Sequence, residues 1–84
     1  SEYVGNTGDR IEITVAAVKL ITSWDGMYGT TYIWKITDEA GNIYIWKTGN
    51  CIPDDCKKIK ATVKGHDEYR GTKQTELTRC KCAA

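Results

Sequence analysis

The chain of 84 residues contains no phenylalanine, one proline and one histidine. Its apolar runs are all far shorter than the roughly 20 residues that a membrane-spanning helix needs, so we expect no membrane contact. The sequence also lacks the serine-hydrolase elbow, the glycine-rich phosphate loop and the paired histidines of zinc proteases. We therefore predict that the protein is not an enzyme.

The composition that remains is globular and favours β structure. Hydrophobic residues make up 40% and aromatic residues 10%, and β-branched and aromatic residues recur throughout the chain. A chain of this length holds one hydrophobic core. We predict one domain over residues 1–84, in which the polar residues 1–8 form a lead-in that covers one end of the fold.

Charge is distributed unevenly although the net charge is only +1. Residues 1–56 carry four basic and eight acidic side chains, whereas residues 57–84 carry eight basic and three acidic ones. The net charges of the two segments are therefore −4 and +5. Such an asymmetry can give a nearly neutral molecule one positive face, but the same lysines would also suit the solvated sides of two strands.

The clearest pattern runs from Thr30 to Lys47. Tyrosine, tryptophan and isoleucine recur with period two on both sides of the segment Asp38–Asn42, which carries a Gly-Asn turn signal. Alternation with aromatic and β-branched residues is typical of an antiparallel hairpin and not of a helix. We predict that this hairpin is the centre of the fold.

Three further strands are predicted around the hairpin. Residues 10–21 alternate and change phase at Lys19–Ile21, which indicates a long strand with a bulge or bend. Residues 58–64 and 73–82 alternate as well. The connecting segments 22–29 and 65–71 are rich in turn residues and are predicted as loops, although the first of them carries Trp24, Met27 and Tyr28.

The element order predicts the fold class. Residues 48–55 leave room for little more than one helical turn, so the fold is all-β with little or no helix. Five strands in this order match a five-stranded Greek-key barrel, the oligonucleotide/oligosaccharide-binding (OB) fold. An SH3-like barrel also has five short strands and is the main alternative.

Two segments resemble OB-fold nucleic-acid-binding domains. Residues 32–43, YIWKITDEAGNI, are similar to the central hairpin of that family with its Asp-x-x-Gly turn. Residues 60–75, KATVKGHDEYRGTKQT, are similar to its fourth and fifth strands, joined by a Tyr-Arg-Gly turn. The longer string over residues 62–81 is similar to small domains encoded by bacteriophages and mobile elements. The helix that the family carries between strands three and four is missing here.

The resemblance implies which side chains point inward. In that family the residues two and four before the hairpin aspartate and two after the glycine face the core, which here gives Trp34, Ile36, Ile43 and, by alternation, Ile45. Tyr44 and Trp46 then point outward beside lysines, as a platform for unstacked bases and phosphates requires. The implied nucleic-acid-binding residues are Trp24, Tyr28, Lys35, Tyr44, Trp46, Lys47, Tyr69, Arg70 and Lys73.

Four cysteines occur as Cys51-x4-Cys56 and Cys80-x-Cys82. Neither spacing is the Cys-x2-Cys of common zinc sites, but four thiolates at one end of a small barrel would suffice to hold a zinc ion. A disulfide between Cys51 and Cys56 and free thiols in a reducing compartment are also open. We expect no cofactor, with zinc at these four cysteines as the alternative.

The leading prediction is an OB-fold domain that binds single-stranded nucleic acid, DNA rather than RNA, in phage or mobile-element replication or recombination. The alternative is a protein-interaction or self-association module, an accessory domain of a larger protein, in which the same outward rings dock a partner. The lack of a charged and then apolar leader favours a cytoplasmic location.

Overall fold

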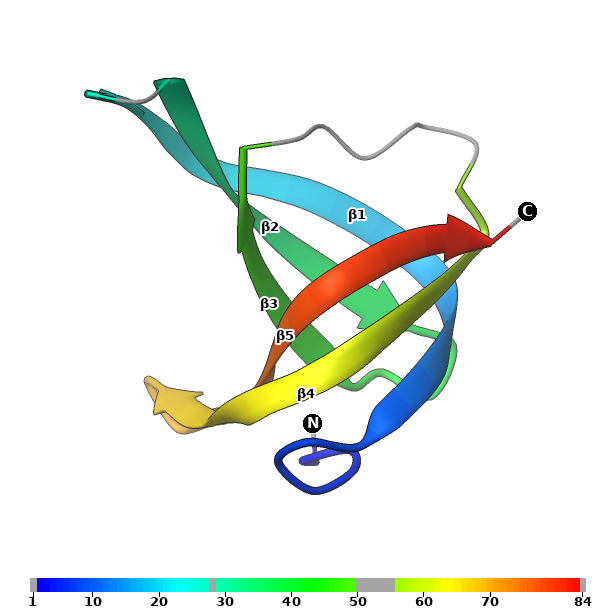
Figure 1. The fold of residues 1–84 in the computed structure, drawn as a ribbon. Helices are drawn as coiled ribbons and strands as arrows, with labels where there is room; N and C mark the ends of the chain where they lie inside the picture. Colours follow the sequence, from blue (N-terminus) through cyan, green and yellow to red (C-terminus); the bar gives the residue numbers. More distant parts are fainter. Residues whose placement is uncertain (1, 28, 50–55, 84) are drawn as a thin grey trace.

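Five strands make up most of the described part of the chain. The computed structural model describes residues 2–27, 29–49 and 56–83. The strands are β1 (Arg10–Gly26), β2 (Gly29–Asp38), β3 (Ile43–Thr48), β4 (Lys58–Tyr69) and β5 (Thr72–Ala83) (Figure 1). These ranges contain no helix, and so none long and apolar enough to cross a membrane. The all-β prediction is confirmed for the described part of the chain.

The five strands form one sheet that closes on itself. Its strand order is β1-β2-β3-β5-β4, and β4 pairs back with residues 10–14 of β1. Neighbouring strands are antiparallel except β3 and β5, which run parallel. Residues 15–26 of β1 pair with β2, so one long strand connects both sides of the closure.

β1 can serve two partners because it bends at two bulges. Its register with β2 shifts between Val15 and Ala17 and again between Leu20 and Thr22. Each shift leaves one extra residue on β1, which increases the local twist and curvature. The second bulge lies where the sequence pattern changes phase, so that prediction is confirmed.

β5 also contains an irregularity, at Arg79. This residue has a positive φ of 53°, and the register with β4 shifts nearby, between Lys60 and Thr62. The Nη1 atom of Arg10 donates to the carbonyl oxygen of Arg79 at 2.9 Å and to the hydroxyl of Thr62 at 3.3 Å. The side chain of Arg10 therefore satisfies a backbone group at the bulge.

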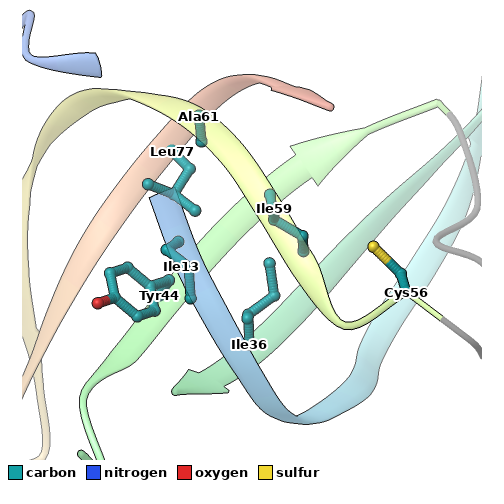
Figure 2. Close-up of a cluster of buried hydrophobic side chains, with 7 residues drawn as sticks. All are labelled: Ile13, Ile36, Tyr44, Cys56, Ile59, Ala61 and Leu77. Atoms are coloured by element: carbon teal, nitrogen blue, oxygen red, sulfur yellow. The ribbon is translucent and has the colours of Figure 1, made fainter. Parts of the chain in front are cut away.

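The hydrophobic core lies inside the closed sheet, and every strand contributes to it. In β4, the isoleucine, alanine and valine at positions 59, 61 and 63 are buried while the lysines between and beside them are exposed, as the alternation predicts. Each fully buried aliphatic side chain contributes about 1.5–3 kcal/mol. Figure 2 shows the buried cluster, which consists of Ile13, Ile36, Tyr44, Cys56, Ile59, Ala61 and Leu77.

The side chains of β3 point in the opposite directions from those predicted. Ile36 pairs with Tyr44, and Trp34 pairs with Trp46. Cross-strand partners point to the same face, so all four side chains lie on the core side. The inward orientation of Trp34 and Ile36 is confirmed. The outward orientation of Tyr44 and Trp46 is wrong, and so is the inward orientation of the two isoleucines of β3 at positions 43 and 45.

The turn between β2 and β3 explains this difference. The N–H of Asp38 donates to the carbonyl of Asn42, and the N–H of Gly41, which has a φ of 87°, donates to the carbonyl of Asp38. The carboxylate of Asp38 also accepts from the N–H of Asn42 at 2.8 Å. Residue 38 is thereby matched with residue 42, which places the even-numbered residues of both strands on the core side.

Most of the described residues in the two segments predicted as loops belong to strands instead. β1 and β2 stay paired as far as Gly26 and Gly29, and β4 and β5 stay paired as far as Tyr69 and Thr72. The second turn has positive φ at both central residues, Arg70 and Gly71, which is the two-residue turn that suits the twist of a hairpin. Two long hairpins therefore project on the left of Figure 1, above and below the end of β3.

Residues 2–8, the described part of the lead-in, lie against one end of the closed sheet (Figure 1). The N–H of Gly8 donates to the carbonyl of Val63, and the N–H of Val4 donates to the hydroxyl of the buried Thr75. The ring of Tyr3 stacks on His66 with 4.5 Å between centroids. The ring of His66 also contacts the carbonyl of residue 5, so this histidine holds the lead-in in place.

Candidate functional site

A groove lies between the two projecting hairpins, over the outer face of β2 and β3. Its volume is about 320 Å³. Every strand contributes to the lining, so the groove depends on closure of the whole sheet. The lining residues are Ile21, Ile33, Ile45, Lys47, Asp67, Tyr69, Gln74 and Glu76.

Isoleucine alternates with lysine on the outer face of β2 and β3, where Ile33, Ile45 and Lys47 line the groove and Lys35 lies beside them. Ile33 pairs directly with Lys47, and Ile45 pairs directly with Lys35. These four residues, the isoleucine–lysine floor, share the outer face because the even-numbered residues of both strands face the core. Ile45 is only 9% exposed although it points outward, since residues of both hairpins line the groove around it.

An exposed aromatic ring lies on each hairpin beside the groove. Trp24 is 48% exposed, and it pairs with Thr31, which is two residues from Ile33, so its ring lies on the groove face of the β1–β2 hairpin. Tyr69 is 58% exposed and lines the opposite wall. The guanidinium of Arg70 lies 5.3 Å from the centre of the Tyr69 ring, within cation–π range.

The charges around the groove are mixed, with an excess of cations. Lys47 and Lys64 border a small hollow next to the groove, together with Glu76. The carboxylate of Asp67 lines the groove itself, and Arg70 lies at the hairpin tip. With Lys35 on the floor, four cations face two carboxylates.

Five of the nine sequence-predicted site residues thus lie around the groove. Each of them is on the outer face of the sheet or on one of the two projecting hairpins. They are Trp24, Lys35, Lys47, Tyr69 and Arg70.

Tyr44 belongs to the core and not to the site. It is 2% exposed, and its hydroxyl donates to the Oδ2 atom of Asp38 at 2.6 Å. Burial, followed by the hydrogen bond and the charge of Asp38, raises the pKa of Tyr44 above its ordinary value. Burial alone would raise the pKa of Asp38, but hydrogen bonds from Tyr44 and Asn42 outweigh it and lower that pKa. The pair locks the β2–β3 turn and offers no surface for a base.

Two more predicted site residues lie away from the groove, and a third lies outside the residues that the structure describes. Trp46 packs against the core beside Trp34, so its ring is not part of an outer platform. Lys73 forms an ion pair with Glu2 at 3.2 Å and lies over the ring of Tyr3, so it faces the lead-in and not the groove. Tyr28 lies outside the described residues.

Sequence reasoning missed most of the groove lining. Three isoleucines on the outer face, Ile21, Ile33 and Ile45, carry neither charge nor an aromatic ring, and such residues are normally assigned to a core. The signal that could have found them is the turn register, because pairing Ile36 with Tyr44 leaves the odd positions outside.

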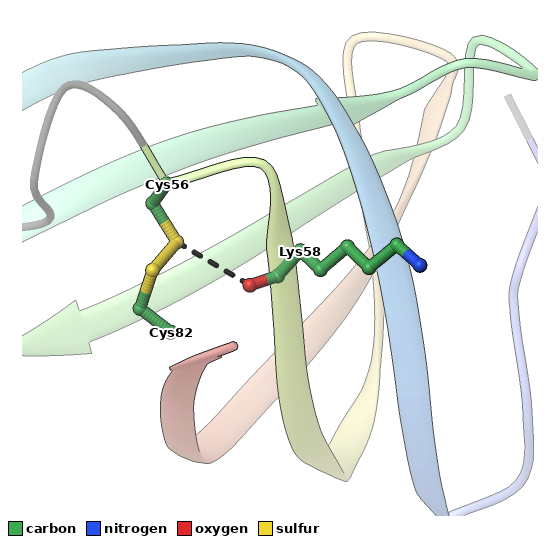
Figure 3. Close-up of a disulfide and its surroundings, with 3 residues drawn as sticks. All are labelled: Cys56, Lys58 and Cys82. Atoms are coloured by element: carbon green, nitrogen blue, oxygen red, sulfur yellow. Dashed lines mark hydrogen bonds between the residues drawn. A yellow bond between two sulfur atoms is a disulfide. The ribbon is translucent and has the colours of Figure 1, made fainter. Parts of the chain in front are cut away.

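The cysteines at the other end of the sheet form a disulfide. Cys56, just before β4, is joined to Cys82 on β5, with 5.9 Å between the Cα atoms (Figure 3). The sulfur of Cys56 also lies 3.4 Å from the carbonyl oxygen of Lys58, a close contact only, because a disulfide sulfur carries no proton to donate. The alternative of a disulfide between Cys51 and Cys56, which the sequence left open, is therefore excluded.

The disulfide also removes two of the four thiolates proposed for zinc. Cys51 lies outside the described residues, and within the described ranges no three potential ligands cluster as a metal ion would require. Cys80 is a free, half-buried thiol. Burial raises its pKa to about 12, although the nearby charge of Arg10 acts in the opposite direction. This thiol stays protonated at neutral pH and is a poor metal ligand.

Comparisons of the chain with protein-family models, with curated proteins and with solved structures give no match. No family is therefore assigned, and the similarity of residues 32–43 and 60–75 to OB-fold domains stays a prediction.

Proposed function

We propose that the closed sheet is an OB-fold Greek-key barrel and that its groove binds single-stranded nucleic acid, DNA in particular. The strand order β1-β2-β3-β5-β4 with a parallel β3–β5 pair supports the fold assignment. Ligands of OB folds lie across strands two and three, between the connections that join strands one to two and four to five. The groove occupies that place.

The observation that carries the proposal is the combination of rings and cations around the groove. Trp24 and Tyr69 are the exposed rings on its two sides, and lysines alternate with isoleucines between them. Unstacked bases can lie on the rings, while the ammonium groups contact phosphates and the isoleucines contact sugars. A duplex keeps its base faces stacked and cannot use the rings, so this arrangement favours single strands.

The expected affinity is modest. Base stacking on an aromatic side chain contributes about 1–3 kcal/mol per base, so two rings supply about 2–6 kcal/mol. A micromolar dissociation constant corresponds to about 8 kcal/mol, so the cations must provide the remainder through counterion release. Binding is therefore expected to weaken strongly as salt rises.

Titration of the intrinsic tryptophan fluorescence with oligo-dT tests the proposal, at about 50 mM and about 200 mM salt. The informative variant is Lys35→Gln with Lys47→Gln, which removes both lysines of the floor. Its matched control is Lys58→Gln with Lys60→Gln, which removes the same charge from the β4 side chains beside Glu12. The slope of log K against log salt concentration is expected to be smaller by about two in the floor variant than in the wild-type chain. In the control this slope should be nearly unchanged.

Two results would overturn the proposal. The first is no binding of the wild-type chain at high micromolar oligonucleotide. The second is an equal loss of affinity in the floor variant and in the control, because binding would then follow the overall charge and not the groove. Replacing oligo-dT by oligo-U separates DNA from RNA.

The process assigned to this binding, phage or mobile-element replication or recombination, is supported only by the similarity of residues 62–81. The predicted cytoplasmic location stays a prediction. The disulfide between Cys56 and Cys82 weighs against it, because reducing systems of the cytoplasm keep most cysteines as thiols.

A further inference from the structure

One wall of the groove is polar, and its polar side chains come from the paired strands β4 and β5. Asp67 pairs with Gln74, and Glu76 lies two residues further along β5, opposite Gly65. Residues two apart on a strand share a face, so the three polar side chains point the same way as Tyr69, and all four line the groove. Two carboxylates and one amide therefore face the place proposed for the nucleic acid.

The side chains of Gln74 and Glu76 have no partner within the described ranges. Both are half-buried, yet neither takes part in a hydrogen bond or an ion pair there. The neighbours of Glu76 explain this, since Ile45 on β3 is apolar and Gly65 on β4 has no side chain. No buried side-chain nitrogen or oxygen of the described residues lacks a partner, so the polar atoms of Gln74 and Glu76 are accessible.

Asp67 is exposed and keeps one carboxylate oxygen for a ligand. Its Oδ1 atom accepts from the backbone N–H of Glu68 at 2.8 Å, which orients the carboxylate and leaves Oδ2 for another donor. Residues two apart on a strand are separated by about 7 Å. A base that stacks on Tyr69 therefore extends toward Asp67 and its partner Gln74.

Carboxylates in a groove for nucleic acid need a role, because they repel phosphates. Ionised Asp67 and Glu76 only accept hydrogen bonds, so the groups of a nucleic acid that suit them are base N–H groups. Cytosine offers the N4 amino group, from which carboxylates accept in protein–DNA contacts. Thymine has the O4 acceptor at that position, and its single N–H lies between two carbonyl oxygens that a carboxylate repels. The amide of Gln74 suits either base, since it both donates and accepts.

We propose that the groove prefers cytosine to thymine, and that Asp67 and Glu76 make this choice by accepting from the amino group of the base. The preference depends on the proposed binding of single-stranded nucleic acid in the same groove. Stacking on Trp24 and Tyr69 and the contacts of the lysines are common to both bases, so oligo-dT still binds, but more weakly. One good contact to a base edge distinguishes two bases by about tenfold or more.

Titration of the tryptophan fluorescence of the full chain with oligo-dC and oligo-dT, each of about eight nucleotides, tests the preference. At about 50 mM salt the wild-type chain should bind oligo-dC about tenfold more tightly than oligo-dT. The informative variant is Asp67→Asn with Glu76→Gln. Each new amide can donate to the O4 atom of thymine, so the ratio of the two affinities should fall to about one.

The matched control is Glu12→Gln with Glu68→Gln, which removes the same charge from residues that do not line the groove. Both variants should bind both oligonucleotides more tightly, because fewer negative charges repel the phosphates. The control should keep the tenfold ratio, whereas the groove variant should lose it.

A change in the ligand tests the same contact without a variant. An oligonucleotide of 2-pyrimidinone, which is cytosine without its amino group, should bind the wild-type chain about tenfold more weakly than oligo-dC. Equal affinity for oligo-dC and oligo-dT, full affinity for the 2-pyrimidinone oligonucleotide or an equal loss of the ratio in the control would each overturn the preference. The proposed function would survive these results if the floor variant still lowered the salt slope. Failure of both oligonucleotides to bind would overturn the two proposals together.

Discussion

The closed sheet and the projecting β1–β2 hairpin, residues 19–27 and 29–35, which we call the β1–β2 arm, share two strands but differ in what surrounds them. Ile13 and Ile21 are both isoleucines of β1, yet the first is fully buried and the second is half exposed. Among the described residues, β1 has a partner strand on one edge only at both positions, β4 beside Ile13 and β2 beside Ile21. Ile13 packs into the core cluster inside the closed sheet, whereas Ile21 lines the groove on the outer face. Burial is therefore decided by which face of the closed sheet a side chain points to, and not by the residue type or by strand formation.

Truncating one isoleucine in each region gives the largest expected contrast. Ile36→Ala in the core should lower the free energy of unfolding by about 2–5 kcal/mol, because it leaves a cavity that cannot collapse. Ile21→Ala on the arm should cost less than about 1 kcal/mol. Urea unfolding followed by tryptophan fluorescence measures both. Equal losses would mean that the arm is packed as tightly as the closed sheet.

Loss of the disulfide should lower the stability of the closed sheet and leave amide exchange in the arm unchanged. Cys56 and Cys82 are 26 residues apart in the sequence, and the entropy of closing such a loop corresponds to about 3.5 kcal/mol. Cys82→Ser should lower stability by about that amount. The control is internal, since a reducing agent should destabilise the wild-type chain and leave the variant unchanged. Faster amide exchange in the arm after reduction would contradict the separation of the two regions.

Removing the hydrogen bond between Tyr44 and Asp38 tests whether the side chain of Tyr44 points toward the core, opposite to the sequence prediction. Tyr44→Phe removes a bond to a charged acceptor and should cost about 1.5–3 kcal/mol. It should also raise the pKa of Asp38 toward its ordinary value, which NMR titration of the carboxyl carbon would show. Tyr69→Phe, at the exposed wall of the groove, is the control and should leave stability unchanged.

The pH dependence of stability should also reflect the shifted pKa values of Asp38 and Tyr44. The lowered pKa of Asp38 stabilises the fold above its ordinary value of 3.8, and this contribution is lost as pH falls through the folded-state pKa. The raised pKa of Tyr44 stabilises the fold below its ordinary value of 10.0, and this contribution is lost as pH rises above it. Urea midpoints from about pH 3 to pH 11 should fall at both ends, and Tyr44→Phe should flatten the alkaline fall.

The smallest effect is expected at the tip of the β4–β5 hairpin. Arg70 has a φ of 51°, a conformation that asparagine adopts more readily. Arg70→Asn should therefore raise stability by about 0.5–1 kcal/mol while it weakens oligonucleotide binding. Gly71→Ala, at a φ of 80°, should lower stability instead. Unchanged oligonucleotide affinity in Arg70→Asn would remove this residue from the groove.

The sequence predicts the strands well because alternation reports directly on which strand faces are covered. The strand pattern around Ile59 and the bulge near Leu20 both follow from period two and its interruption. The face of β3 that points toward the core could not be predicted in the same way. It depends on how the carboxylate of Asp38 sets the turn, and one residue of difference there exchanges the two faces of the strand.

Features that depend on closure of the sheet could not be predicted from the sequence. Segments 22–29 and 65–71 look like loops by composition, but a partner strand continues alongside each of them. The partner of Cys56 is set by the pairing of β4 with β5 and not by sequence spacing. Of the isoleucine–lysine floor, the two lysines were predicted as binding residues, whereas Ile45 was assigned to the core.

β1 runs without a break from Arg10 to Gly26, and β4 holds one end of it while β2 holds the other. Hydrogen bonds in an antiparallel ladder lie perpendicular to the strands, so a force along β1 loads many of them at once. A pull on the arm would thus be resisted in shear by both ladders together. Tension applied at the arm would therefore be transmitted along β1 to the strand pair that it forms with β4.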